Sequence, residues 1–188
     1  MSLATIDCGT TNSRVYIVDE TGTILGKASK KVGVRDTAIQ GSNATLKKGL
    51  TETFYTALET ADHSLADLSL VLSSGMITSE IGLIEIPHIW APASLDDLAD
   101  GIKKVHDTTV FPVDIPVHFI RGIKNVFDPA TINLTDVGTL DFMRGEETQV
   151  AGILSEQTLP LPTTVVVLSS HTKFIPIDAD QKILGSLT

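Results

Sequence analysis

The chain opens with the apolar run Leu3-Ala4-Thr5-Ile6, which leads into the hexapeptide Asp7-Cys8-Gly9-Thr10-Thr11-Asn12. Apolar residues resume at 15–18 and, after a Thr21-Gly22 turn, at 23–32. Short apolar stretches separated by turn residues are typical of strands joined by hairpins. The sequence therefore predicts an antiparallel three-stranded meander whose first turn is the hexapeptide.

The hexapeptide carries residue types that suit a phosphate loop. A carboxylate such as Asp7 at the end of a strand can hold Mg²⁺, directly or through water. Gly9 lets the backbone approach an anion closely, successive amides can form a concave nest, and Thr10 and Thr11 add hydroxyl donors. Asp, Gly, Thr and Asn are also common in ordinary hairpin turns, so both interpretations stay open on the residues alone. The position directly after the first strand favours phosphate.

A long helix and a buried strand are expected next. The helix presents one apolar face through Leu46, Leu50, Phe54, Leu58 and Ala61, with Ser42 or Asn43 as its cap. The strand covers 68–72 and ends at Ser73-Ser74-Gly75-Met76. Further elements follow in the second half: a helix that starts in a capping box at Ser94, a strand at 117–120, a helix at 146–155, and strands at 165–168, 173–177 and 182–184.

The opening pattern of strand, polar turn and further strands begins again near Thr163. We therefore expect an N-terminal domain over 1–162 and the first strands of a second, similar and truncated domain over 163–188.

Composition and charge exclude several classes of protein. The 14 Lys and Arg residues against 23 Asp and Glu give a net charge of −9, the opposite of what proteins that bind nucleic acids or anionic membranes need. The single cysteine, Cys8, excludes an intrachain disulfide and a cysteine-rich zinc site. The N-terminus has no basic segment before Asp7, and no apolar run is long enough for a membrane span. The sequence predicts a soluble, cytoplasmic protein.

The strand and hexapeptide resemble the first phosphate loop of the actin/hexokinase/Hsp70 superfamily of phosphotransferases. Its members have two similar domains, each starting with a three-stranded meander, and bind ATP between them. The resemblance implies an α/β fold: an actin-like ATPase (ribonuclease H-like) domain with a mixed five-stranded sheet and flanking helices.

A second set of motifs resembles the 2-dehydro-3-deoxygalactonokinases of that superfamily. It comprises Met143-Arg144-Gly145-Glu146-Glu147-Thr148-Gln149, Ser73-Ser74-Gly75-Met76-Ile77-Thr78-Ser79, and Ser170-His171-Thr172-Lys173-Phe174, which is similar to the family's second phosphate loop. Ser169-Ser170 replaces the usual Gly-Thr there, so the backbone has fewer allowed conformations and a phosphate would approach it less closely. Cys8 stands where relatives often carry an aromatic residue, which implies different local packing.

The resemblance implies ATP-dependent phosphorylation of 2-dehydro-3-deoxy-D-galactonate at the 6-hydroxyl, a reaction of galactonate degradation, with ATP and Mg²⁺ as cofactors. The partner is a small sugar acid, and a homodimer is compatible with the family. Asp7 would organise the metal and take part in catalysis. The phosphates would contact Gly9, Thr10, Thr11, Asn12, Ser170, His171, Thr172 and Lys173.

The resemblance also points to a catalytic base at the start of the helix that precedes the second domain. Glu146 is the first choice and Glu147 the second. The two side chains cannot both face the substrate, because adjacent residues on a helix point in different directions. Acids are common in first turns because the helix dipole favours them. On composition alone, both glutamates would therefore simply satisfy the helix N-terminus and face solvent.

Several residues are candidates for substrate binding, each with a structural alternative. Arg144 matches a carboxylate bidentately, or it forms a salt bridge to Asp141 or Glu147. Asn12 and Arg14 can reach substrate or γ-phosphate, or Arg14 is an exposed strand residue. Three further residues are candidates for a sugar pocket, although the methionine among them is as well explained as a core residue: Gly75, Met76 and Ser79.

Two other functions fit the same loops. One is a nucleotide hydrolase, and the other is a non-catalytic, actin-like module that uses nucleotide as a conformational switch. The Arg144-Gly145-Glu146-Glu147 run favours the kinase. The histidines outside the second loop show no metal-ligand spacing and are interpreted as structural or solvated: His63, His88, His106 and His118.

Overall fold

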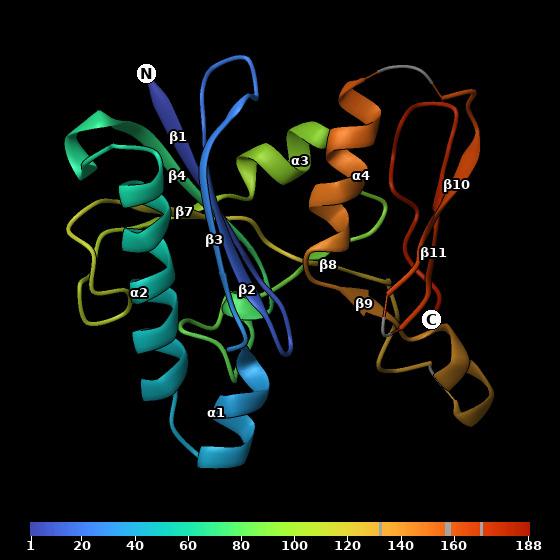
Figure 1. Ribbon diagram of the computed structural model, residues 1–188. Helices are drawn as coiled ribbons and strands as arrows, with labels where there is room; N and C mark the ends of the chain where they lie inside the picture. Colours follow the sequence, from blue (N-terminus) through green and yellow to red (C-terminus); the bar gives the residue numbers. More distant parts are fainter. Residues whose placement is uncertain (132, 157–158, 170) are drawn as a thin grey trace. The chain divides into compact units, whose positions relative to one another are not determined.

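The computed structural model describes residues 1–131, 133–156, 159–169 and 171–188 (Figure 1). The chain forms two compact units. Unit 1 contains residues 1–86 and 102–120, and unit 2 contains residues 87–101 and 121–188.

A mixed sheet forms the centre of unit 1. Among the described residues it has six strands in the order β3-β2-β1-β4-β7-β6. Their bounds are β1 Ser2–Cys8, β2 Ser13–Val18, β3 Ile24–Lys30, β4 Leu68–Gly75, β6 Lys103–Val105 and β7 Val117–Phe119. The meander is confirmed, because β1–β2 and β2–β3 pair antiparallel. The sheet is mixed, because β1–β4 and β4–β7 pair parallel.

The expectation of five strands is corrected by β6, which pairs antiparallel with β7. Its sequence, Lys103-Lys104-Val105, is short and has two exposed lysines, so it gives no alternating pattern in the sequence. It forms because β7 supplies a free edge.

Two helices accompany this sheet, α1 (Val34–Gln40) and α2 (Ala44–Thr60), and α2 lies along β3 (Figure 1). The helix packs close to the sheet because Gly26 has no side chain: a Cβ there would lie 2.6 Å from the carbonyl oxygen of Ala57. Asn43 is the residue before α2, as expected, but its side chain makes no capping bond, and the Ala44 amide donates instead to Ser42 Oγ at 3.3 Å. Two 3₁₀ turns complete the unit: η1 Leu65–Asp67 and η2 Met76–Thr78.

The core of unit 1 lies between the sheet and these helices. It includes the expected helix face of Leu46, Leu50, Phe54 and Leu58. Cys8 is fully buried there, and burial raises the pKa of its thiol to about 12, so the side chain stays a neutral packing group.

In its described residues, unit 2 contains two small sheets, one of β5, β8 and β9 and one of β10 and β11. The bounds of its elements are β5 Ile89–Trp90, α3 Leu95–Asp100, β8 Ile123–Lys124, η3 Leu134–Thr139, β9 Phe142–Met143, α4 Glu146–Ser155, β10 Thr163–Val167 and β11 Lys173–Ile177. The capping box of α3 is confirmed: the Asp97 amide donates to Ser94 Oγ at 3.1 Å, and the Ser94 amide donates to Asp97 Oδ2 at 2.8 Å.

The strand expected at 182–184 is wrong. Ile183 makes isolated bridges to Ala93 and to Ile177. Its neighbours bond to β11 and the turn after it, since the Leu184 amide donates to the Pro176 carbonyl at 2.9 Å and the Asp178 amide to the Lys182 carbonyl at 3.1 Å, but no continuous ladder forms over 182–184.

The predicted domain boundary coincides with the start of β10 at Thr163, which lies in the same compact unit as α4. The division into domains at 162 and 163 stays a prediction. None of the helices in the described part of the chain is both long and apolar enough to cross a bilayer.

Candidate active site

The turn after β1 is held by backbone hydrogen bonds. The Gly9 amide donates to the carbonyl oxygen of Asn12 at 2.9 Å and closes the turn. The amides of Val34 and Arg35, at the start of α1, donate to the carbonyl oxygens of Gly9 at 3.3 Å and Thr10 at 3.0 Å. Both carbonyl groups therefore point toward α1.

This arrangement fixes the direction of two amides. The cis peptide bonds of the described chain precede Pro92 and Pro162, so the peptides from Gly9 to Thr11 are trans, and each places its N–H opposite its carbonyl. The Thr10 and Thr11 amides consequently point away from α1, on an exposed part of the turn. Successive amides on one side of a turn form an anion nest.

The close contact between turn and helix requires a glycine at position 33. A Cβ on Gly33 would lie 2.4 Å from the carbonyl oxygen of Thr10. Any larger residue would push the turn away from α1.

Asp7 lies at the end of β1 beside this turn. Its Oδ2 is 2.9 Å from Nη1 of Arg14 on β2, and the side chains are 47% and 48% exposed. Arg14 is thus an exposed strand residue, as one interpretation expected, and it is directly in contact with the predicted metal ligand.

Gly75 ends β4 next to the turn, with Cys8 as its partner in the parallel register. Its φ of 90° suits glycine, and a Cβ would lie 2.6 Å from the carbonyl oxygen of Cys8. Met76 packs against the core, and Ser79 Oγ donates to the Met76 carbonyl at 2.6 Å. The structure therefore gives both of these side chains structural contacts, and the sugar pocket stays a prediction.

The residues around Asp7 fit Mg²⁺ bound together with a nucleotide. Mg²⁺ is usually held by one or two carboxylates and the phosphate oxygens of its substrate. Asp7 offers one accessible carboxylate beside the anion nest. Among the described residues there is no group of three or more His, Cys, Asp and Glu side chains that would hold a metal by itself.

The start of α4 in unit 2 places the two glutamates in different surroundings. Gly145, with a φ of 112°, precedes the helix, and its amide donates to both carboxylate oxygens of Glu147, at 2.9 and 2.8 Å. The Arg144 amide donates to Glu146 Oε2 at 3.1 Å. Both side chains satisfy amides at the helix start, but Glu147 is fully buried, whereas Glu146 is half-buried.

Burial raises the pKa of Glu147 from its ordinary value near 4.5 to about 7. A carboxyl with such a pKa exchanges protons near neutral pH, but this side chain is enclosed. Glu146 is the accessible member of the pair.

Arg144 directs its guanidinium to a histidine: Nη2 lies 3.4 Å from Nδ1 of His88. Asp141, one of its expected partners, instead forms an ion pair with Lys173, whose Nζ lies 2.8 Å from Oδ1. The positive charge of Arg144 lies near enough to Glu147 to lower the pKa of that carboxyl and so to counteract part of the rise caused by burial.

The second predicted phosphate loop follows β10. Lys173 is buried in its ion pair, His171 is exposed, and Thr172 is half-buried. The Ser169 hydroxyl donates to the carbonyl oxygen of His171 at 2.9 Å. Ser170 lies outside the described residues.

The predicted site residues thus fall into two groups. Unit 1 carries the first loop, and its members are Asp7, Gly9, Thr10, Thr11, Asn12, Arg14, Gly75, Met76 and Ser79. Unit 2 carries the other described members, Arg144, Glu146, Glu147, His171, Thr172 and Lys173. Sequence reasoning missed the contacts of His88 and Asp141, because nothing in the local sequence of either residue indicates its partner.

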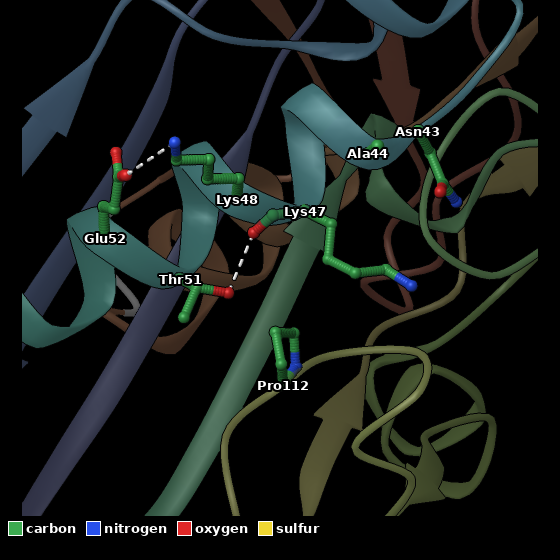
Figure 2. A pocket seen from close by; sticks show the side chains of 7 residues that line it. All are labelled: Asn43, Ala44, Lys47, Lys48, Thr51, Glu52 and Pro112. Carbon is green, nitrogen blue, oxygen red and sulfur yellow. Dashed lines mark hydrogen bonds and ion pairs between the residues drawn. The ribbon is translucent and has the colours of Figure 1, made fainter.

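A separate hollow of about 440 Å³ lies beside α2 in unit 1 (Figure 2). It is lined by Asn43, Ala44, Lys47, Lys48, Thr51, Glu52 and Pro112. Its charged groups have partners, because Lys48 pairs with Glu52 at 3.9 Å and Lys47 donates to the Thr109 carbonyl. None of the predicted site residues lines it.

Known proteins are similar to this chain in sequence and in fold. The family model described as 2-keto-3-deoxy-galactonokinase matches residues 7–186. A protein of Rhizobium meliloti (strain 1021), named probable 2-dehydro-3-deoxygalactonokinase, is 26% identical over 186 residues, which is 98% of this chain and 52% of the relative. The chain therefore spans about half the length of this curated relative.

Solved structures confirm the α/β fold of the actin-like ATPase class. A protein of Sinorhizobium meliloti assigned as a 2-dehydro-3-deoxygalactonokinase has a TM-score of 0.71 at 23% identity over 98% of this chain and 52% of its own. A reductive activator for a corrinoid, iron-sulfur protein has a TM-score of 0.59 at 13% identity over 96% of this chain and 30% of its own. At these identities the likeness shows the fold alone. The family match covers nearly the whole chain, and on that ground the chain belongs to the 2-keto-3-deoxy-galactonokinase family.

Proposed function

We propose that the full-length protein that carries this chain is an ATP-dependent sugar-acid kinase that phosphorylates 2-dehydro-3-deoxy-D-galactonate at its 6-hydroxyl. The observation that carries the proposal is the turn after β1, where the Thr10 and Thr11 amides face away from α1 beside the accessible carboxylate of Asp7. Membership of the family supports the choice of acceptor.

The first step of the proposal is the binding of the ATP phosphates. The amides and hydroxyls of Thr10 and Thr11 donate to phosphate oxygens, and Asn12 lies next to them on the same exposed turn. The second loop contributes Ser170, His171, Thr172 and Lys173. Lys173 can bind a phosphate only if its ammonium leaves Asp141 or donates to the phosphate and to Asp141 at the same time.

Asp7 is the group that holds Mg²⁺, which when bound neutralises phosphate charge. Arg14 already contacts Asp7 at 2.9 Å, so its guanidinium is placed to turn toward the γ-phosphate when the carboxylate takes up the metal. Because both side chains are exposed, breaking the ion pair between Asp7 and Arg14 costs little free energy.

Glu146 is the proposed base. A base must come within hydrogen-bond reach of the hydroxyl that attacks, and Glu146 is accessible, whereas Glu147 is enclosed. Glu147 then serves as a positioning residue, because it holds the Gly145 amide with both carboxylate oxygens and so fixes the start of α4.

Arg144 is the proposed partner of the substrate carboxylate, because its planar guanidinium donates two parallel hydrogen bonds to such a group. Gly75, Met76 and Ser79 are proposed to border the sugar. We further propose that residues 163–188 begin the second of two similar domains and that the protein works in the cytoplasm.

The proposal is tested by coupled ADP release from the full-length protein with a panel of 2-keto-3-deoxy sugar acids. We expect ADP release that depends on Mg²⁺ and on the acceptor, and that Asp7→Asn abolishes. ADP release without any acceptor would indicate a nucleotide hydrolase, and nucleotide binding without ADP release would indicate a non-catalytic module. Either result contradicts the kinase.

A further inference from the structure

The three-stranded sheet of unit 2 brings together three residues that are far apart in the sequence. Ile89 pairs with Ile123 in the parallel β5–β8 ladder, and Ile123 pairs with Met143 in the antiparallel β8–β9 ladder. One step beyond these pairs, the same register places His88, Gly122 and Arg144 side by side.

Gly122 lets the side chains of His88 and Arg144 come very close to the backbone just before β8. A Cβ there would lie 2.3 Å from the Met143 carbonyl oxygen, 2.7 Å from Cδ2 of His88 and 2.8 Å from Cγ of Arg144. Only a residue without a side chain allows the histidine ring and the arginine stem to meet over it.

The backbone and ring of His88 are fixed from several sides. Arg121 donates from Nε to the Pro87 carbonyl at 2.6 Å and from Nη2 to the His88 carbonyl at 2.8 Å. The ring lies edge-on to Phe142, with 5.4 Å between centroids. His88 is therefore held through both its backbone and its ring, beside Arg144.

The contact with Arg144 defines the protonation of this ring. A guanidinium only donates, so Nδ1 of His88 accepts from Nη2 at 3.4 Å, and the ring proton is on Nε2. Nε2 is buried and has no hydrogen-bond partner among the described residues. Burial, followed by the charges of Arg144, Lys124 and Arg121, lowers the pKa of His88 to about 4, which agrees with a neutral ring.

Lys124 does not compete for this ring, because its ammonium lies over the indole of Trp90, 3.8 Å from the centroid. A half-buried imidazole with one unsatisfied nitrogen lowers the stability of the folded chain. Such a cost calls for an explanation, and the contact of this ring with the arginine proposed to bind substrate offers one.

We propose that His88 is a positioning residue for substrate binding, whose Nδ1 holds the Arg144 guanidinium in the orientation that receives the carboxylate of the sugar acid. The inference rests on the proposed function. A free arginine side chain samples many rotamers, and fixing one in advance reduces the entropy lost when the substrate binds. The benefit applies to a carboxylate in particular, because bidentate pairing requires a defined plane.

Two variants of the full-length protein separate this role from a general packing role. His88→Leu removes the acceptor, and His88→Asn restores a side-chain oxygen at the δ position. Gly122→Ala is a poor test, since its Cβ would also clash with the Met143 backbone. His118→Leu is the matched control: His118 is also a half-buried histidine with a buried ring nitrogen, Nδ1, that has no partner among the described residues, and it lies in unit 1.

Each variant is assayed with the sugar acid and with its neutral C1 carboxamide. For the acid, we expect His88→Leu to raise KM about tenfold with kcat changed less than about twofold, because uniform binding is lost. We expect His88→Asn to restore most of the affinity, the carboxamide to be affected little by either variant, and His118→Leu to have wild-type KM.

Three results would overturn the inference: an unchanged KM in His88→Leu, an equal rise for acid and carboxamide, or the same rise in His88→Asn as in His88→Leu. If His88→Leu fails to fold, two other measurements take its place. The KM of His88→Asn for the acid should stay near that of the wild type, and NMR of the wild-type protein should show the ring proton of His88 on Nε2; a proton on Nδ1 would overturn the inference. A wild-type enzyme that does not phosphorylate the acid contradicts the proposed function itself, whereas an active wild type with an indifferent His88→Leu contradicts only the role of His88.

Discussion

Nζ of Lys173 on β11 lies 2.8 Å from Oδ1 and 3.1 Å from Oδ2 of Asp141, and both side chains are largely buried. Asp141 also accepts hydrogen bonds from Ser186 Oγ at 2.8 Å and from the Phe142 amide at 2.8 Å. One carboxylate thus ties β11 and the end of the described chain to the segment that begins β9. This contact stabilises unit 2, and it also competes for the lysine that the proposed second phosphate loop would use.

We expect Asp141→Asn to destabilise unit 2 by about 3 kcal/mol at neutral pH, because it leaves the buried ammonium of Lys173 without its counter-ion. The free energy of opening, measured by amide hydrogen exchange along β11, checks this. Asp114→Asn, at an exposed partner of His106, is the control and should change it little.

The effect of Asp141→Asn should depend on pH. Burial would raise the pKa of Asp141, but the hydrogen bonds from Lys173, Ser186 and the Phe142 amide outweigh it and hold the pKa below its usual range. The stabilisation is therefore complete above the unfolded pKa and is lost as the pH falls through the folded value. The difference between wild type and variant should shrink below about pH 4, and a constant difference would contradict the ion pair.

Asp7→Asn should abolish turnover in the full-length protein and leave the fold intact. The amide loses the charge that attracts Mg²⁺, while the exposed pair with Arg14 contributes at most about 1 kcal/mol to stability. Steady-state ADP release and circular dichroism measure the two effects. Near-wild-type turnover in a folded variant would refute the assignment of Asp7.

Glu146→Gln should lower kcat by two or more orders of magnitude, about the contribution of a general base, with little change in KM. Glu147→Gln keeps a side chain of the same shape that still accepts from the Gly145 amide, so we expect a smaller loss. Comparison of kcat for the two variants decides between them. A large loss in Glu147→Gln alone would reverse our order.

The stability of the wild type should fall relative to Glu147→Gln as the pH rises. The folded pKa of Glu147 is raised to about 7 by burial, so its contribution is fully present below the unfolded pKa near 4.5 and is lost as the pH rises through 7. The difference in unfolding midpoint between the two proteins should widen from about pH 4.5 to 7 and then level off. A difference independent of pH would contradict the raised pKa of Glu147.

Sequence reasoning predicts the parts of this fold that have a strong local pattern. The meander of β1 to β3, the apolar face of α2 and the capping box at Ser94 each follow from periodicity or turn chemistry within a few residues. The turn at Asp7 to Asn12 is found in the same way, because its residue types and its place after β1 are local.

The rest depends on contacts between distant segments. β5, β8 and β9 have two residues each, too few for any periodicity, and form only by pairing with one another. Helix α1 starts at Val34, and the residue before it, Gly33, has no side chain to act as a cap signal. The pairs His88–Arg144 and Asp141–Lys173 join residues 56 and 32 positions apart, so neither can be deduced from the surrounding sequence.

The central claim is that the protein transfers the γ-phosphoryl group of ATP to the 6-hydroxyl of the sugar acid. Phosphorus NMR of the reaction of the full-length protein with Mg²⁺, ATP and 2-dehydro-3-deoxy-D-galactonate tests it most directly. We expect a phosphomonoester signal coupled to the two protons of a primary carbon, which grows as the γ-phosphate signal of ATP declines. Inorganic phosphate as the sole product, or an ester coupled to the single proton of a secondary carbon, would contradict the account.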